Sequence, residues 1–376
     1  MQWTILGSGF GLGFYIPSLL LCRQLEARGH AAEAVVFESY LKREKQEKIA
    51  ESRREYHANF AVALVAQRLP ADVRPSIDWE AAEALFSRWE KEDRRRFVVL
   101  SGHWIYLLDR YRERMGEKPV EAELLYVDAG VSPSWKSVRK YIPDYASRYR
   151  EVSMYDAASR EVLLRLPVTG EPPVPYAERE DRLVLHGGGW GMGTYLEKRT
   201  ELEGKGFALD IIAGAMEEAQ PHGRHRFWMN DPGWEAWRTE GEPPRHTFPR
   251  FGEVRPGERP VFTSPGRRHG LYERVRGSKA IVSKPGGATL IDSLASATPV
   301  VFLDPFGPHE AKNAELWIAN GFGISYEAWK EADFSLSLLE RLHVTLLARA
   351  GTIRSYVDQL CMNDTSDKHD IPIEVR

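Results

Sequence analysis

The segment from Ser283 to Thr289, with the sequence SKPGGAT, places a cation, a glycine pair and a hydroxyl group within seven residues. Glycines let an anion approach the backbone, and the first N–H groups of a helix are unpaired and lie at its positive end. A plain tight turn is the commoner explanation of a glycine pair. Because Lys284 and Thr289 add a charge and a donor to Gly286 and Gly287, the segment predicts a phosphate site.

The flanking residues predict the elements that position this turn. Residues 280–283 form a short β-branched run, and residues 299–303 form a second apolar run of strand length. Between them, Leu290, Ile291 and Leu294 recur at helical spacing. The pattern is that of a strand, a glycine turn, a helix and a second strand, which indicates a parallel βαβ unit.

Polar residues follow the second of these strands. Glu310 has two oxygens that can accept hydrogen bonds from both hydroxyls of a ribose. Asn313 lies almost one helical turn later and can bond a sugar or a phosphate. A phosphate turn followed by such groups suits a nucleotide sugar.

In this arrangement, residues 279–324 resemble the donor half of GT-B glycosyltransferases, especially the branch with diacylglycerol glucosyl- and galactosyltransferases and peptidoglycan lipid II synthase. The resemblance implies that Gly286, Gly287 and Thr289 hold a UDP diphosphate, that Glu310 holds the ribose, and that His309 and Asn313 lie beside the sugar. Two positions depart from the family, which often has Glu at Asp292 and Gly at Ala297.

Length and composition agree with this interpretation. A chain of 376 residues predicts two domains, and a net charge of −3 argues against a dedicated nucleic-acid binder. Cys22 and Cys361 form no metal-binding spacing and no disulfide framework. No stretch is long and apolar enough to span a membrane, and the N-terminus lacks the features of a signal peptide, so we expect a cytoplasmic protein.

Two further glycine turns follow predicted strands. The first spans residues 7–13 after a strand at 3–6 and before a helix at 17–25, and the second spans residues 187–193 after a strand at 183–185. Neither turn has glycines at relative positions one, three and six, which argues against a dinucleotide-binding enzyme. We assign Gly188 and Gly189 to the donor site, and we expect His186 to pack or cap locally.

On the acceptor side, Gly11, Gly13 and Phe14 lie where related enzymes have a Gly-Gly-His motif. Because a phenyl ring cannot take a proton, a general base at this site must come from another residue. His103 and Asp128 each follow a predicted strand at its carboxyl end, the edge that faces the ligand in open α/β sheets. Turn or cap roles are common for such residues, yet both are candidate bases, and an ordinary histidine has a suitable near-neutral pKa.

These observations predict an α/β protein of the GT-B class, with two Rossmann-like domains that face each other across a cleft. We expect an acceptor-binding domain at 1–165, a proline-rich linker at 166–180, a nucleotide-sugar domain at 181–350 and a helix end with a polar tail at 351–376. The last helix is expected to cross back onto the first domain, residues 60–66 to enter the core and residues 41–54 to form a solvated helix. Peripheral membrane contact is only weakly supported.

The predicted function is transfer of a sugar, with inversion, from a nucleotide diphosphate donor such as a UDP-sugar to a small-molecule acceptor, a specialised metabolite. Neither a metal nor a cofactor is expected, the nucleotide sugar being a substrate. The alternatives are a lipid glycosyltransferase of the diacylglycerol type, a nucleotide-sugar epimerase, and a non-catalytic protein that binds a nucleotide sugar. The sequence has no motif that identifies the acceptor.

Overall fold

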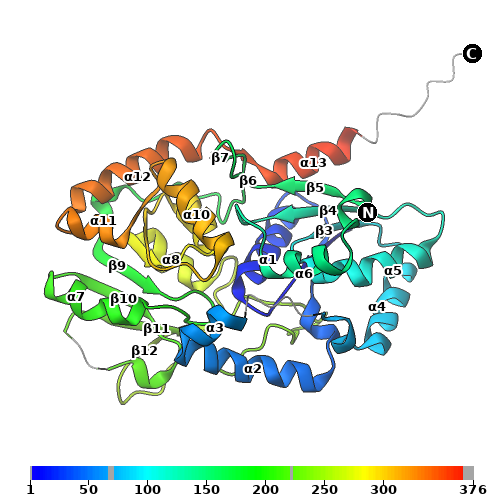
Figure 1. Ribbon diagram of the computed structural model, residues 1–376, viewed down its shortest axis with the longest axis horizontal. Coiled ribbons are helices and arrows are strands. Elements are labelled where there is room, and N and C mark those ends of the chain that lie inside the picture. Colours follow the sequence, from blue (N-terminus) through cyan, green and yellow to red (C-terminus); the bar gives the residue numbers. More distant parts are fainter. Residues whose placement is uncertain (1, 67–71, 221–222, 367–376) are drawn as a thin grey trace, which may run out of the picture.

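The computed structural model describes residues 2–66, 72–220 and 223–366 of the chain. Two open β-sheets lie side by side, each covered by helices (Figure 1). The first sheet has the strand order β2-β1-β3-β4-β5, and the second has the order β12-β11-β10-β9-β13-β14-β15. This is the α/β architecture with two Rossmann-like halves that the sequence predicts.

All neighbouring strands of the first sheet are parallel. Its strands are β1 (Trp3–Gly7), β2 (Ala32–Val36), β3 (Arg96–Val99), β4 (Glu121–Tyr126) and β5 (Arg150–Ser153). Its helices are α1 (Leu12–Glu26), α2 (Arg43–Ala58), α3 (Phe60–Ala66), α4 (Trp79–Lys91), α5 (Ile105–Met115) and α6 (Pro133–Tyr141). Three short strands follow, β6 (Tyr155–Asp156), β7 (Glu161–Val162) and β8 (Leu164–Arg165).

The second sheet is parallel except for its edge strand β12, which runs antiparallel to β11. Its strands are β9 (Glu180–His186), β10 (Ala208–Ile212), β11 (Arg226–Asn230), β12 (Phe251–Val254), β13 (Ser278–Ser283), β14 (Val300–Phe302) and β15 (Gly323–Ser325). Its helices are α7 (Arg199–Gly204), α8 (Gly270–Gly277), α9 (Gly287–Ser296), α10 (Pro308–Ala319), α11 (Tyr326–Glu331) and α12 (Leu336–Ala350).

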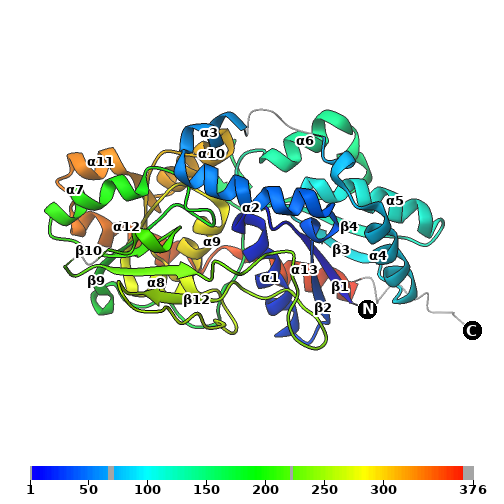
Figure 2. The same cartoon turned by 90° about the horizontal axis from the view of Figure 1, so that it is seen from below.

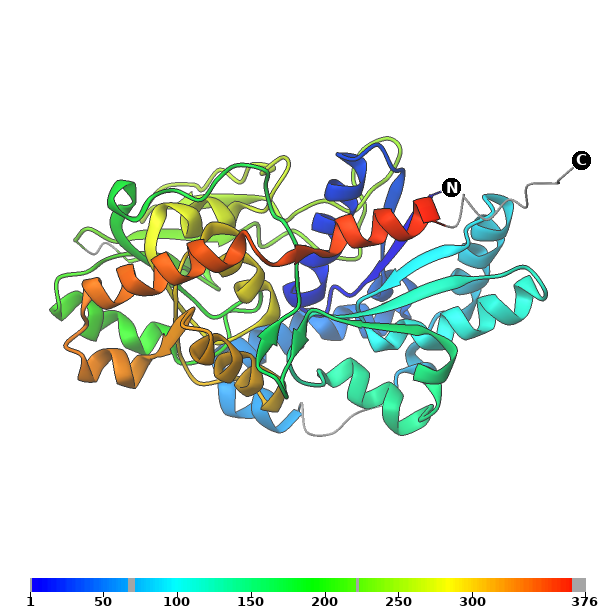
Figure 3. The same ribbon diagram turned by 90° about the horizontal axis from the view of Figure 1, so that it is seen from above.

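The C-terminal elements cross back to the first half, as expected. After α12, strand β16 (Arg354–Ser355) pairs with β8, and α13 (Tyr356–Ser366) continues over the first half (Figure 3). The Tyr356 hydroxyl donates to the buried Glu123 on strand β4, at 2.8 Å. Arg28 pairs with Asp358 on α13 at 2.6 Å. The polar tail predicted for the C-terminus falls mainly on residues 367–376, which lie outside the described residues.

A second segment, the loop between β11 and β12, also joins the two halves. The loop between β11 and β12 leaves the second sheet and packs on the first half, where its backbone carbonyls accept hydrogen bonds from Tyr15 at 2.7 Å and from Ser39 at 3.0 Å. One apolar cluster accordingly includes residues of both halves, from α1 through α9 to α13. These contacts do not show at which residues one domain ends and the next begins, so the predicted domain boundaries remain our proposal.

Two local expectations differ from the structure. Helix α1 begins at Leu12, not near Pro17, so the proline lies inside the helix and one N–H bond is missing there. Residues 60–66 form helix α3, and among residues 60–65, whose burial is described, only Ala63 is buried while Val62 and Val65 are exposed. The prediction that this apolar run belongs to the core was therefore wrong, because an apolar run alone does not show what covers it.

Candidate active site

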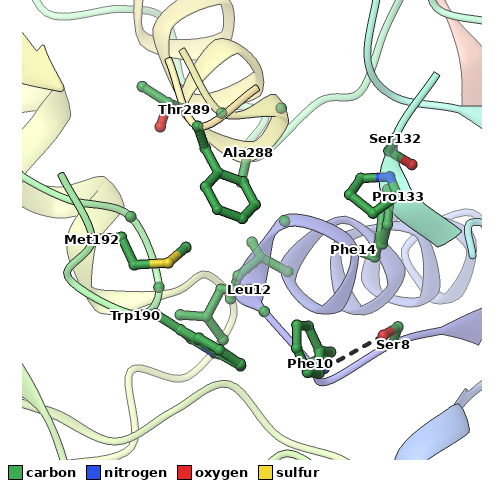
Figure 4. Close-up of a pocket in the computed structure, with 18 of the residues that line it drawn as sticks. Ser8, Phe10, Leu12, Phe14, Ser132, Pro133, Trp190, Met192, Ala288 and Thr289 are labelled. Atoms are coloured by element: carbon green, nitrogen blue, oxygen red, sulfur yellow. Dashed lines mark hydrogen bonds between the residues drawn. The ribbon is translucent and has the colours of Figure 1, made fainter. Parts of the chain in front are cut away.

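A cavity of about 490 Å³ lies between the two halves, and the carboxyl ends of strands from both sheets face it. Of the residues predicted for the site, all but Asn313 line this cavity: Gly11, Gly13, Phe14, His103 and Asp128 from the first half, and Gly188, Gly189, Lys284, Gly286, Gly287, Thr289, His309 and Glu310 from the second. Side chains from these separate segments converge on one space (Figure 4). Residues that the sequence assigned to separate halves thus line one cavity, and their roles stay predictions.

The predicted phosphate turn lies at the base of the cavity. Strand β13 ends at Ser283, Gly286 is the N-cap of α9, and no side chain caps the helix. The first backbone N–H groups of α9 are thus available to an anion. A Cβ at Gly287 would lie 2.9 Å from an Asp128 carboxylate oxygen and 3.0 Å from the Val127 carbonyl oxygen. Glycine is required at position 287 because Val127 and Asp128 of the first half lie against it. The sequence alone did not reveal this reason.

Lys284 and Glu310 form a buried ion pair beside this turn. The Lys284 Nζ atom donates to a Glu310 carboxylate oxygen at 2.5 Å, and the other carboxylate oxygen accepts from the Phe306 N–H at 2.8 Å. The same ammonium lies 3.4 to 3.5 Å from ideal Cβ positions built at Gly188 and Gly286. It therefore lies between two glycine turns, where one anion can contact both. Glu310, predicted to bind ribose, is engaged by two protein donors in this structure.

The second glycine turn, residues 187–193, closes on itself through hydrogen bonds from Gly191 to Gly188 and from Met192 to Gly187. The short helix η6 (Tyr195–Lys198) and α7 follow it, whereas the first glycine turn opens the longer helix α1. The Gly188 N–H donates to the Nδ1 atom of His186 at 3.1 Å. His186 is fully enclosed and burial lowers its pKa to about 3, so it acts as the local cap that we expected.

Asn313 has a different role from the predicted one. Its side-chain N–H groups donate to Asp128 at 2.8 Å and to the Pro285 carbonyl at 2.9 Å, and its oxygen accepts from the Ala129 N–H at 2.7 Å. The residue is fully buried and ties the end of β4 to the phosphate turn. His309 lies in the cavity wall as predicted, and its buried Nδ1 atom has no partner among the described residues.

The two candidate bases lie in different environments. Burial lowers the pKa of His103 to about 4, so the near-neutral value expected for an ordinary histidine does not hold. Burial instead raises the pKa of Asp128, against the opposing effects of nearby His309 and of the hydrogen bond from Asn313. A higher pKa makes a carboxylate a stronger base, whereas a lower one makes an imidazole weaker.

Several residues of the cavity wall were not predicted. Phe10 and Trp190 contact each other at a ring-centroid distance of 4.5 Å, and Tyr56 lies 5.7 Å from the Trp190 ring. Leu12, Met192 and Pro133 extend this apolar wall (Figure 4). The residues come from four distant segments with no shared spacing, so no sequence pattern could have assembled them.

A buried pair, formed by the N-cap residue of α8 and a residue of α9, also borders the cavity. The Nε2 atom of His269 lies 2.9 Å from an Asp292 carboxylate oxygen, and both side chains are buried. Asp292 was noticed in the sequence only as a departure from the family's Glu. Its position on the helix that begins at the phosphate turn would have been sufficient to place it near the ligand.

Metal ligands and membrane spans were sought among the described residues. In that part of the chain, no three His, Cys, Asp or Glu side chains are grouped as a metal site. No described helix has the length and apolar character needed to cross a bilayer.

Comparison with known proteins identifies the fold. No family model matches the chain. The processive diacylglycerol beta-glucosyltransferase of Staphylococcus carnosus (strain TM300) is 36% identical over 67 residues, which is 18% of this chain and 17% of that enzyme. The crystal structure of the glycosyltransferase SsfS6 from Streptomyces sp. SF2575, complexed with thymidine diphosphate, matches at a TM-score of 0.58 with 13% identity, covering 97% of this chain and 99% of that one. MurG of Acinetobacter baumannii matches at 0.54 with 10% identity, covering 96% and 98%. The chain has the GT-B glycosyltransferase fold.

Proposed function

We propose that this protein is a glycosyltransferase that moves a sugar from a nucleotide diphosphate donor to a hydroxyl-bearing acceptor. The observation that carries the proposal is the uncapped start of α9 beside the buried Lys284, in a cavity bordered by both halves. Charge develops on the diphosphate as it leaves, and fixed dipoles with a cation stabilise such charge most effectively when water is excluded. The GT-B fold supports the same assignment, and one structural relative was solved with thymidine diphosphate.

The donor is proposed to lie against the second half. Its diphosphate would contact the start of α9 and the Lys284 ammonium, with Thr289 as a hydroxyl donor. His309 lies close to Gly130 of the first half and Glu310 follows it on α10, so we propose that the sugar lies beside these two residues. We propose a UDP-sugar as the donor, with a TDP-sugar as the nearest alternative. No metal ion and no cofactor is needed for this charge stabilisation.

For the acceptor, we propose deprotonation by Asp128 in a displacement that inverts the sugar. Asp128 lines the cavity beside the start of α9, and burial raises its pKa, whereas burial lowers the pKa of His103. Phe14, at the family's histidine position, supplies apolar surface instead of a proton acceptor. Ser132 also lines the cavity and is drawn in Figure 4.

The walls of the first half suit an acceptor with a large apolar part. Phe10 is 47% exposed although it borders the cavity, and a ligand that covered this ring would remove apolar surface from water. We propose a small apolar metabolite. One observation favours a lipid-borne acceptor instead: α3 exposes Val62 and Val65 on either side of Ala63, which lines the cavity.

Release of nucleotide diphosphate tests the function. UDP- and TDP-sugars would be offered with phenolic alcohols in solution and with diacylglycerol in vesicles, and the freed diphosphate would be measured. We expect acceptor-dependent release that the Glu310→Ala variant reduces at least about tenfold, because the loss of Glu310 leaves Lys284 buried without its partner. Glu315→Ala, on the exposed side of the same helix, is the matched control.

The outcomes of this screen separate the alternatives. Sugar isomerisation without an acceptor would indicate an epimerase. Binding of UDP or TDP without turnover of any acceptor would indicate a non-catalytic protein. Undiminished transfer by the Glu310→Ala variant would refute the proposed donor site.

A further inference from the structure

His57, near the C-terminal end of α2, makes a contact between the two halves that the catalytic proposal does not use. Helix α2 belongs to the first half and runs along the face of the molecule towards the second half (Figure 2). The Nδ1 atom of His57 lies 2.7 Å from the Gly191 carbonyl oxygen, in the second glycine turn. Its Nε2 atom contacts the carboxylate of Glu218, in the short helix η7 (Met216–Glu218).

Both partners of the ring are acceptors. A carbonyl oxygen and a carboxylate oxygen cannot donate, so each ring nitrogen must carry a proton for both hydrogen bonds to exist. Only the doubly protonated imidazolium satisfies this requirement. The geometry therefore indicates that His57 is positively charged when the two halves are arranged as described.

The surrounding backbone is shaped for this ring. A Cβ at Gly214 would lie 2.3 Å from the His57 ring, and one at Gly191 would lie 2.7 Å from its Nδ1 atom. Gly191 also has a φ of +62°, which other residues rarely adopt. The second carboxylate oxygen of Glu218 accepts from the Gly214 N–H at 2.8 Å, so the carboxylate joins the ring to the end of β10.

The turn that His57 holds is part of the donor cavity. Gly188, Gly189, Trp190 and Met192 of this turn line the cavity, and an ideal Cβ at Gly188 would lie 3.4 Å from the Lys284 ammonium. The next helix adds a second contact, since Phe60 on α3 packs 6.4 Å from Phe306, whose N–H binds Glu310. The end of α2 and the start of α3 thus contact both sides of the proposed diphosphate site.

We infer that His57 is a positioning residue that, as an imidazolium, fixes the glycine turn 187–193 in the conformation that receives the nucleotide diphosphate. This inference rests on the proposed function of the same cavity. When the ring loses a proton, one of its two hydrogen bonds is lost and the turn is held less tightly. The apparent nucleotide affinity then falls in proportion to the fraction of molecules that stay in the receptive conformation.

The sign of the pH dependence follows from the groups around the ring. Among the described residues, Glu218 from η7 and Arg53 from its own helix act on the charge of His57, and the Tyr195 hydroxyl would lie 3.3 Å from a Cβ at the neighbouring Gly191. The hydrogen bond with Glu218 raises the pKa of His57, while burial and Arg53 oppose the rise. Because this pKa is raised, the contribution of His57 to nucleotide affinity is complete at a pH below the ordinary pKa of 6.5. It is lost as the pH rises through the raised pKa.

The test is calorimetric titration of UDP and TDP into the full-length protein between pH 6 and pH 9. For the native protein we expect affinity to fall about fivefold or more as the pH rises. His57→Gln keeps one donor but carries no charge, so its affinity should already be low at pH 6 and should not change with pH in this way. Glu218→Gln should weaken binding similarly, and the double variant should be no weaker than either single variant. Since neither residue contacts the proposed reacting atoms, KM should rise while kcat changes little.

His30→Gln is the matched control, because His30 precedes β2 and therefore lies at the edge of the first sheet opposite the cavity. Its binding should follow the native pH profile. A His57→Gln variant that binds nucleotide with native affinity and a native pH profile would overturn the inference. If that variant does not fold, native binding by the Glu218→Gln variant would overturn it. Absence of nucleotide binding by the native protein at every pH would instead refute the proposed function.

Discussion

At the scale of single residues, burial decides which groups in the cavity can act as bases. His103 is the more familiar residue type for proton transfer, yet burial disfavours its charged form and lowers its pKa to about 4. Asp128 is buried as well, and for a carboxylate burial raises the pKa and so increases basicity. We therefore propose Asp128 as the base, although residue type alone would favour His103.

The Asp128→Asn variant tests this ranking. The asparagine keeps an oxygen that can accept the hydrogen bond from Asn313 but cannot take a proton. We expect kcat to fall by about 10²- to 10⁴-fold, the usual contribution of a general base. In the native enzyme, kcat should fall as the pH drops through the raised pKa of Asp128, at a value above the ordinary 3.8.

His103→Gln provides the comparison in the same assay. If His103 only packs against Phe37, kcat should stay within about tenfold of the native value. A large loss with His103→Gln and none with Asp128→Asn would reverse the assignment.

At the scale of elements, glycines mark where the two halves come closest. The loop after β4 contacts the start of α10, and a Cβ at Gly130 would lie 2.6 Å from the His309 Cα atom. A Cβ at Gly189 would lie 2.9 Å from the Leu12 backbone nitrogen. These contacts involve backbone atoms, which cannot rotate away as a side chain can, so even a methyl group must displace a whole segment.

Gly130→Ala should therefore destabilise the protein by about 1–3 kcal/mol, the typical cost of overpacking, and should lower kcat by moving α10 relative to Asp128. Urea unfolding and steady-state kinetics would measure the two effects. Gly170→Ala is the control, because nothing lies within 4 Å of a Cβ at that position. Equal stability of the two variants would show that the halves separate readily at this contact.

At the scale of the whole molecule, α13 fastens the chain end to the first half. The Tyr356 hydroxyl is buried against Glu123, whereas the Arg28–Asp358 pair is partly exposed. Loss of a hydrogen bond to a buried charged acceptor costs more than loss of an ion pair in water, because the buried oxygen cannot recover a partner from solvent.

Tyr356→Phe should accordingly lower the free energy of unfolding by about 1–3 kcal/mol, whereas Arg28→Ala should lower it by less than about 1 kcal/mol. Chemical denaturation of both variants would measure the difference. A larger loss for Arg28→Ala would mean that the surface pair, and not the buried hydroxyl, holds α13 in place.

Much of the fold and of the donor side could be predicted from the sequence, because strand, glycine turn and helix are close together along the chain. Residues 280–283 and 299–303 form neighbouring strands as predicted, and Gly286 lies at the start of a helix. The role of Asn313 as a bridge between halves could not be predicted, since it depends on Asp128, 185 positions away. The same holds for His57, whose partners belong to the other half.

The loop between β11 and β12 has a consequence for protein engineering. Its residues pack on the first half so closely that a Cβ at Gly9 would lie 2.3 Å from the Ala236 Cβ, and its carbonyls receive hydrogen bonds from Tyr15 and Ser39. A chimera that joins the first half of this protein to the second half of a relative would replace this loop with one of another shape. Exchange of acceptor preference between relatives should therefore succeed only when residues 231–250 are transferred together with the first half.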